Sequence, residues 1–134
     1  MWGMNIPYAA ILAATVASYI AGSLWYMALG RPWRAALGWV ETDTPYRPAP
    51  LALAIAFVAQ LAMATALSGV LFHMGSTGVR RAVIAGVLIW AGFVLPSLAT
   101  NVVFQKRSAR LILIDGGHWL LVLAVIGAVL GTMS

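Results

Sequence analysis

Two residues that can exchange a proton lie close together in the last apolar segment of this chain. Asp115 and His118 are three positions apart, so they share one face of a helix. A carboxylate placed there can orient the imidazole ring, and the pair can relay a proton or bind a cation. The competing interpretation is structural. An aspartate in the first turn of a helix is stabilised by the helix dipole and can pair with a nearby arginine.

Polar and aromatic residues of other segments are predicted at the same depth as this pair. Few polar side chains occur inside the apolar segments, and such residues are often functional because placing them in lipid is costly. We therefore predict a candidate binding layer near one membrane face, made of Trp25, Tyr26, Asn101, Asp115 and His118. Its basic border consists of Arg31, Arg107 and Arg110.

Other kinds of site are less well supported by the residues. A zinc site needs three or four ligands, the chain has no cysteine, and the second histidine, His73, lies at the opposite end of the predicted molecule. The G-x-S-x-G motif of serine hydrolases is absent, and Gly116-Gly117 lacks the other residues of a phosphate-binding loop. We expect no metal, no cofactor and no catalytic residue.

The chain contains six tryptophans, and most of them fall near the predicted ends of the apolar segments. Tryptophan prefers the depth of the lipid headgroups, so anchoring in the membrane interface is the favoured explanation. Binding of a pigment or a quinone is the alternative that the tryptophan content leaves open.

Four apolar segments must position these residues, at about 6–29, 51–72, 82–104 and 111–133. A helix of about 20 mostly apolar residues crosses the hydrocarbon core of a bilayer, and each segment reaches that length. Charged residues make up only 8% of the chain, against about 25% in soluble domains. We predict an all-α integral membrane protein, a single domain over 1–134 built as a bundle of four transmembrane helices. The first is expected to be a retained helix, because residues 1–7 carry no lysine or arginine.

The first connection is the longest, and its first part, 31–39, is predicted to form a short helix in the membrane interface. Pro32 suits a first helical turn and Gly38 suits a helix end. The prolines of 41–50 predict an extended return to the membrane. The middle and third connections are short, which makes consecutive helices antiparallel neighbours.

Small residues at four-residue spacing predict where helices pack closely, because lipid provides no hydrophobic force between them. The first segment carries Ala10, Ala14, Ser18 and Gly22, and the second carries Ala52, Ala56, Gln60, Ala64 and Ser68. We expect these two series to pack within the chain. Gly127 and Gly131 in the last segment are a candidate contact between copies of the chain.

Pro96 predicts a kink in the third segment, because an interior proline leaves one helix carbonyl without its usual partner. Ser97 and Thr100 are close enough in sequence to help satisfy the freed backbone group. We favour a kink that shapes the helix for packing. The alternative is a hinge or the wall of a cavity.

The charge distribution predicts the orientation in the membrane. The first and third connections together carry six basic residues, whereas the middle connection carries only Arg80 and Arg81. The positive-inside bias therefore places the first and third connections in the cytoplasm and both termini outside the inner cell membrane. The net charge of +5 comes from residues at helix ends, so the expected partner is the lipid bilayer and not nucleic acid.

Several motifs resemble those of a known family. They are Gly22-Ser23-Leu24-Trp25-Tyr26, Gly30-Arg31-Pro32-Trp33 followed by Leu37-Gly38, Gly92-Phe93-Val94-Leu95-Pro96, Asn101, and Leu113-Ile114-Asp115-Gly116-Gly117-His118. Together they resemble domain-of-unknown-function family 1761, a family of small bacterial and fungal membrane proteins. The resemblance implies a four-helix membrane protein and no established activity. It also draws attention to the predicted layer of Trp25, Tyr26, Asn101 and Asp115.

The residues leave three hypotheses for the function. The favoured one is a structural or accessory helical subunit without enzymatic activity, which binds a larger membrane complex or itself as a homo-oligomer. The alternative is binding or translocation of a small solute or a proton through the polar layer, with Asp115 and His118 as the titrating pair. A membrane-embedded enzyme that acts on a lipid is the third.

Overall fold

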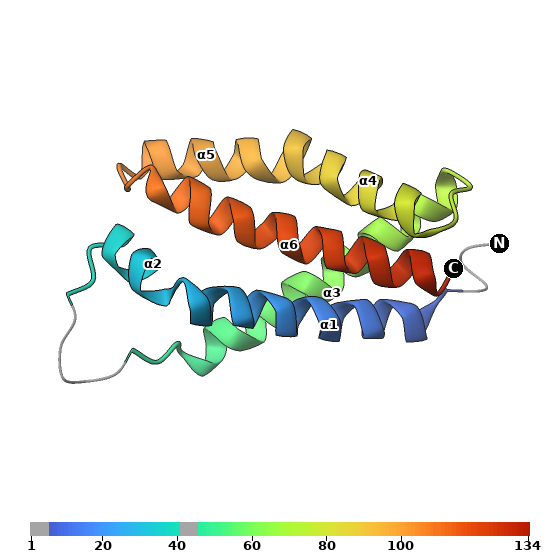
Figure 1. The fold of residues 1–134 in the computed structure, drawn as a ribbon, viewed down its shortest axis with the longest axis horizontal. Coiled ribbons are helices and arrows are strands. Elements are labelled where there is room, and N and C mark those ends of the chain that lie inside the picture. Colours follow the sequence, from blue (N-terminus) through green and yellow to red (C-terminus); the bar gives the residue numbers. More distant parts are fainter. Residues whose placement is uncertain (1–5, 41–45) are drawn as a thin grey trace.

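The computed structural model describes residues 6–40 and 46–134, and this part of the chain is helical throughout apart from its short connections (Figure 1). Four helical rods are long and apolar enough to cross a membrane: α1 (Tyr8–Ala28), α3 (Pro50–His73), the rod Val79–Phe104 and α6 (Arg110–Thr132). The short helix α2 (Gly30–Ala36) follows α1 directly. The predicted all-α architecture with four spans is confirmed.

The observed boundaries lie close to the predicted ones, and the largest difference has a local cause. The third rod begins at Val79 instead of at residue 82, because Gly78 ends the preceding turn with a φ of 91°. Arg80 and Arg81 therefore belong to the first turn of that rod. Gly38 has a positive φ of 83° and follows the last residues of α2, which agrees with its predicted role at the helix end. The predicted extended segment 41–50 lies partly outside the described residues.

The third rod is interrupted by a π-helical turn. It consists of α4 (Val79–Ile89), the π-helix η1 (Trp90–Val94) and α5 (Leu95–Phe104). The turn ends two residues before Pro96. The Ser97 hydroxyl donates to the carbonyl of Phe93 and the Thr100 hydroxyl to that of Pro96, and neither is the carbonyl that Pro96 frees, which lies at Gly92, four residues before the proline. The rod changes direction at this turn (Figure 1), which brings α5 alongside the first half of α6.

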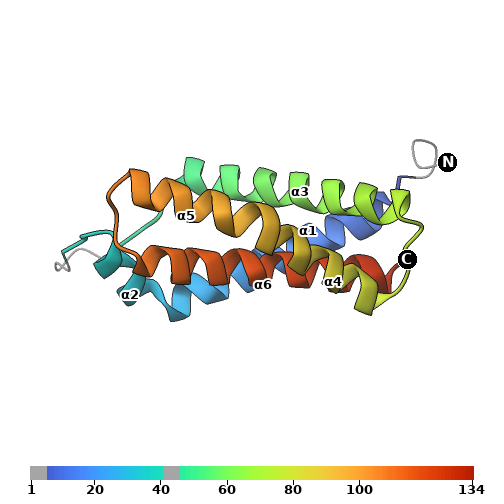
Figure 2. The same ribbon diagram turned by 90° about the horizontal axis from the view of Figure 1, so that it is seen from above.

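Helix α6 lies at the centre of the molecule. It packs on α4 along one side and on α1 along the other, and these are the two most extensive helix contacts. Helix α3 packs mainly on α1 and crosses behind it at an angle (Figures 1 and 2). The main contacts therefore follow the order α4, α6, α1 and α3, and α3 makes smaller contacts with both α6 and α4.

The seam between α4 and α6 is formed by glycines that allow backbone contact. A Cβ atom added to Gly127 would lie 2.7 Å from the carbonyl oxygen of Ala82, and one added to Gly131 would lie 2.6 Å from the Cα of Val79. A Cβ atom on Gly86, in α4, would lie 2.8 Å from the carbonyl oxygen of Leu123. Gly127 and Gly131 are thus occupied within the chain, and the prediction that they form a contact between copies is wrong.

The hydrophobic core fills the half of the molecule that carries both chain ends and the turn 74–78, which we call the terminal end (Figure 1). Ala14 of α1 and Ala64 of α3 are completely buried there against Val122 and Ile126 of α6. The opposite half, which carries α2 and the turn 105–110, is called the basic end. There α1 and α3 separate, and the first turns of α3 are exposed, as at Leu51.

Candidate functional site

The Asp115-Gly116-Gly117-His118 segment of α6 is surrounded on every side near the basic end. Asp115 accepts a hydrogen bond of 2.5 Å from the hydroxyl of Tyr26 on α1. The indole of Trp33 on α2 also faces the carboxylate, and Arg107 acts on it through space. Helix α2 is therefore more than an interfacial anchor. It folds back so that Trp33, half-buried, covers Asp115 and contacts the ring of Tyr26.

Two indoles contact the backbone of this segment of α6, and Gly117 makes room for one of them. The indole N–H of Trp25 donates to the carbonyl of Ile114 at 3.0 Å, and that of Trp90 donates to the carbonyl of Gly116 at 2.8 Å. A Cβ atom on Gly117 would lie 2.6 Å from the ring of Trp25, so no larger residue fits without moving that ring. Trp25 and Trp90 thus fix α6 between α1 and the third rod, and Trp25 is a positioning residue.

His118 lies three residues after Asp115 on α6 and is packed against α1. Its ring centroid is 4.5 Å from that of Tyr26 and 4.6 Å from that of Trp119. Gly22 makes this approach possible, because a Cβ atom there would lie 2.6 Å from Nε2 of the imidazole. The side chain is 6% exposed, and its Nδ1 has no hydrogen-bond partner in the described residues. An unsatisfied buried nitrogen costs about 1–3 kcal/mol, so this atom is a place where a bound molecule or water would stabilise the protein.

A cleft of about 780 Å³ opens beside His118, between α1, α3 and α6. Its walls are of two kinds. Aromatic side chains come from α1, α2, α6 and the segment before α3, and they include Tyr26, Trp33, Tyr46 and Trp119. Small side chains come from α3 and consist of Ala52, Ala56 and Ala59, which share one face of that helix. The cleft is the space left where α3 diverges from α1.

Gln60 closes the deep end of the cleft. Its side chain is 2% exposed, and its amide oxygen accepts a hydrogen bond of 2.8 Å from the hydroxyl of Ser18. Beyond this pair lie the completely buried Ala14 and Ala64 of the core. Because Gln60 lies near the middle of α3 (Pro50–His73), the cleft reaches about half-way along the spans and ends there.

The cleft opens sideways between α1 and α3. Met27, Leu53 and Ile55 line it and are also among the exposed apolar side chains, with 78%, 44% and 59% of their surface accessible. The Tyr19 hydroxyl donates to the carbonyl of Leu53, and this hydrogen bond links α1 to α3 beside the mouth. The mouth of the cleft is therefore bordered by exposed apolar side chains.

The structure brings together most of the predicted layer. Trp25, Tyr26, Asp115 and His118 lie side by side on α1 and α6. Asn101 is not part of the group, because its side chain is exposed on α5 and does not line the cleft. Of the predicted basic border, which was Arg31, Arg107 and Arg110, all three side chains are exposed, and Arg107 is the one that acts on Asp115. The predicted kink residue Pro96 shapes the third rod and lines neither the cleft nor the second cavity.

Sequence reasoning missed the α3 wall of the cleft and the role of Trp33. The small residues of α3 were predicted as one packing series, but only its later members pack. Gln60, Ala64 and Ser68 are buried, whereas Ala52 is exposed and Ala56 is half-buried in the cleft. The available signal was Gln60 itself, a polar residue in mid-span that marks where the series changes from packing to lining.

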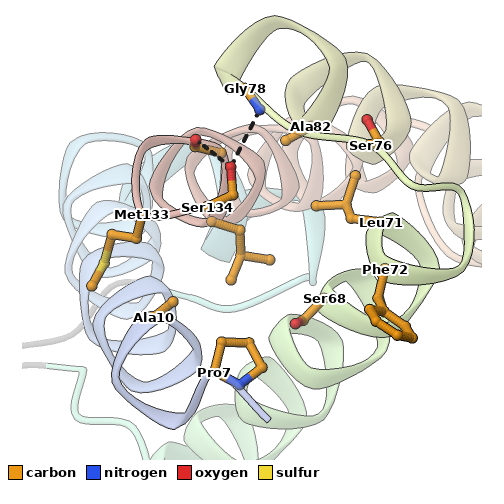
Figure 3. Close-up of a pocket in the computed structure, with 12 residues that line it drawn as sticks. Pro7, Ala10, Ser68, Leu71, Phe72, Ser76, Gly78, Ala82, Met133 and Ser134 are labelled. Atoms are coloured by element: carbon orange, nitrogen blue, oxygen red, sulfur yellow. Dashed lines mark hydrogen bonds between the residues drawn. The ribbon is translucent and has the colours of Figure 1, made fainter. Parts of the chain in front are cut away.

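A second, smaller cavity of about 200 Å³ lies at the terminal end (Figure 3). Its lining is mostly apolar, and Ser134 crosses its edge by donating to the carbonyl of Gly131 and accepting from the backbone N–H of Gly78. Ser76 at its rim has a buried hydroxyl without a partner in the described residues. Figure 3 shows this cavity between the ends of α1, α3, α4 and α6.

Comparison with known proteins agrees with this picture. The family model described as "Protein of unknown function (DUF1761)" matches residues 9–131, which is nearly the whole chain. The chain belongs to the DUF1761 family. The match includes every helix that contributes to the cleft, so the site lies entirely within the DUF1761 domain. No curated protein and no solved structure matches the chain.

Among the described residues of this DUF1761 protein, no group of three histidine, cysteine, aspartate or glutamate side chains is placed to hold a metal ion. The two buried polar side chains of the cleft lining are His118 and Gln60. The lining also includes the more exposed polar side chains of Tyr19, Ser23, Tyr26, Arg34 and Tyr46. Such a site orients a mostly apolar molecule by a few hydrogen bonds.

Proposed function

We propose that the protein binds a small, lipid-soluble molecule in the cleft between α1, α3 and α6. The observation that carries this proposal is the cleft itself, which has about 780 Å³ of space and two buried polar side chains, His118 and Gln60, in its lining. Ligand sites in proteins have volumes of roughly 300–1,000 Å³, mostly apolar walls and a few polar groups that fix orientation. The cleft has all three properties.

The lateral mouth supports entry from the membrane. A molecule dissolved among the acyl chains reaches the cleft between Met27 and Leu53 without crossing a polar surface. The ligand is therefore a compound that partitions into lipid, in contrast to an ion or a sugar.

We propose that the protein binds its ligand in the cleft and does not let a proton or a solute pass freely across the membrane. The Ser18–Gln60 hydrogen bond and the buried Ala14 and Ala64 separate the cleft from the terminal end. A proton or a solute would cross this barrier only if α1 and α3 moved apart. The Tyr26–Asp115 hydrogen bond opposes movement of α1 relative to α6, and we assign it this positioning role.

We place the basic end at the cytoplasmic face of the inner cell membrane. Arg31, Arg47, Lys106, Arg107 and Arg110 lie exposed on the two connections of this end. Basic residues in short connections favour the cytoplasmic side. The cleft then opens within the cytoplasmic leaflet, and both termini face outward.

The glycine pair of α6 does not support a structural or accessory role. Gly127 and Gly131 pack against α4 inside the molecule, and an outward glycine face on α6 is not available for a second copy. The exposed apolar residues of α3, such as Val58, are what a lipid-facing helix carries in any case.

The test is to identify what the purified protein carries. The protein is extracted in native lipid nanodiscs, and bound small molecules are identified by mass spectrometry. Ala56→Phe fills the cleft and should remove the bound species. Ala54→Phe adds the same ring to the exposed face of α3 and should retain it. Equal amounts in both variants, or no species beyond bulk phospholipid in the unmodified protein, would refute the proposal.

A further inference from the structure

We infer that the ligand of the cleft is a flat ring compound with hydrogen-bond-accepting oxygens, the chemical class of quinones and related ring ketones. This inference rests on the proposed function and specifies the ligand of the same site. Three features of the cleft carry it: the shape of its two walls, the kind of polar group at its deep end, and the depth of that end in the membrane.

The two walls suit a planar molecule. Ala52, Ala56 and Ala59 follow one another on a single face of α3, so they form a flat strip of methyl groups. The opposite side presents the rings of Trp33 and Trp119. Aromatic rings prefer offset-stacked or edge-to-face contact with other rings. A flat strip opposite them leaves room for a ligand ring in either arrangement. An acyl chain has no ring and cannot make these ring contacts.

The polar group at the deep end of the cleft is a hydrogen-bond donor. The amide oxygen of Gln60 already accepts the Ser18 hydroxyl, so the group that Gln60 offers is its NH₂. A neutral imidazole carries one donor and one acceptor nitrogen, so His118 does not select between accepting and donating ligands. A ligand that satisfies Gln60 therefore carries an acceptor oxygen on its ring.

The depth of Gln60 separates a ring compound from a phospholipid. Gln60 lies near the middle of α3, so the polar end of the ligand is held near the middle of the membrane. The ester and phosphate oxygens of a phospholipid stay at the membrane surface, where only its acyl chains extend inward. A phospholipid in the cleft would leave the NH₂ of Gln60 without an acceptor. A lipid-soluble ring ketone places its oxygens at that depth.

The test uses two probes that share a ten-carbon alkyl tail, a decyl-benzoquinone and decylbenzene. The whole protein in nanodiscs is titrated with each, and native mass spectrometry counts the adducts. The quinone should form one saturable adduct with an affinity at least tenfold higher than that of decylbenzene. Ala56→Phe should abolish this adduct, and Ala54→Phe should keep it.

A second variant tests the polar contact. Gln60→Leu removes the amide and should weaken quinone binding about tenfold while leaving decylbenzene binding unchanged. The comparison of the two probes on the unmodified protein needs no variant, so a Gln60→Leu protein that fails to fold does not decide the result.

The outcomes separate this inference from the proposed function. If both probes bind equally and only Ala56→Phe abolishes them, the cleft binds apolar molecules and the assignment of a ring ketone is wrong. The same conclusion follows if native lipid chains occupy the cleft and the quinone does not displace them. If no probe or lipid depends on residue 56, both the inference and the proposed function are overturned.

Discussion

The seam between α4 and α6 and the pair formed by α1 and α3 use the same kind of residue for opposite purposes. Along α6, Gly127 and Gly131 bring two backbones into direct contact. Along α3, Ala52 and Ala56 face a cleft of about 780 Å³. Small residues at regular spacing permit close approach, but the course of the neighbouring helix decides whether that approach occurs.

The difference between the two pairs lies in their crossing. Helix α4 runs beside α6, and the glycine contacts extend from Gly86 near its end to the turn before it. Helix α3 crosses α1 at an angle (Figure 2). Ala14 and Ala64 are completely buried, whereas Tyr26 and Ala52 line the cleft. The α4–α6 pair is thus packed along the terminal end, whereas the α1–α3 pair leaves a cleft at the basic end.

The largest effect is expected at the closed seam. Gly127→Leu inserts a side chain where even a Cβ atom would lie 2.7 Å from the Ala82 carbonyl oxygen. Because backbone cannot move aside cheaply, the free energy of unfolding in mixed micelles should fall by about 3 kcal/mol or more. Gly92→Leu is the matched control, since nothing lies within 4 Å of a Cβ there. Equal losses for both variants would mean that α4 and α6 do not form this seam.

A smaller effect is expected where α1 is joined to α6 beside the cleft. Tyr26→Phe removes the hydrogen bond to Asp115, and such a bond to a carboxylate is worth about 1.5–3 kcal/mol. Tyr19→Phe removes an exposed hydrogen bond to the Leu53 carbonyl and should cost less, about 0.5–1.5 kcal/mol. Thermal unfolding in nanodiscs gives the ranking. A Tyr19→Phe protein less stable than the Tyr26→Phe protein would contradict the assigned positioning role of Tyr26.

The third effect concerns the attachment of the kinked rod to α6. Trp90→Phe keeps the ring and removes its hydrogen bond to the Gly116 carbonyl, so stability should fall by about 1 kcal/mol. Hydrogen exchange at α5 should rise in the same variant, because Trp90 holds the π-helical turn against α6. Unchanged exchange at α5 would show that this attachment does not depend on the indole.

The sequence predicts the helices and their depth better than it predicts their faces. Four apolar lengths and two short connections suffice to place Asp115, His118 and Asn101 at one depth. The sequence does not show that a π-helical turn forms at 90–94 and adds one residue to the helical repeat before Asn101. The extra residue changes the face of the helix on which Asn101 lies, and its side chain is exposed. Facing direction after such a turn depends on hydrogen bonds that the sequence does not specify.

The motif around Asp115 is only partly readable from the sequence for a similar reason. Its acid and imidazole identify it as unusual within an apolar segment. The purpose of Gly117 becomes clear only with the indole of Trp25 in place, and that of Gly116 only with Leu95 and Leu98 of α5, because these residues come from other helices. Long-range crossing, such as that of α3 over α1, has no local signature either.

The central claim is that α3 is packed at Ala64 and open at Ala56. The most direct measurement compares the unfolding free energies of Ala64→Phe and Ala56→Phe. Ala64 is completely buried, so the added ring should cost about 3 kcal/mol. At Ala56 the ring enters the cleft, and stability should stay within about 1 kcal/mol of the unmodified protein. Equal, large losses at both positions would show that α1 and α3 are closed along their whole length and that no cleft exists.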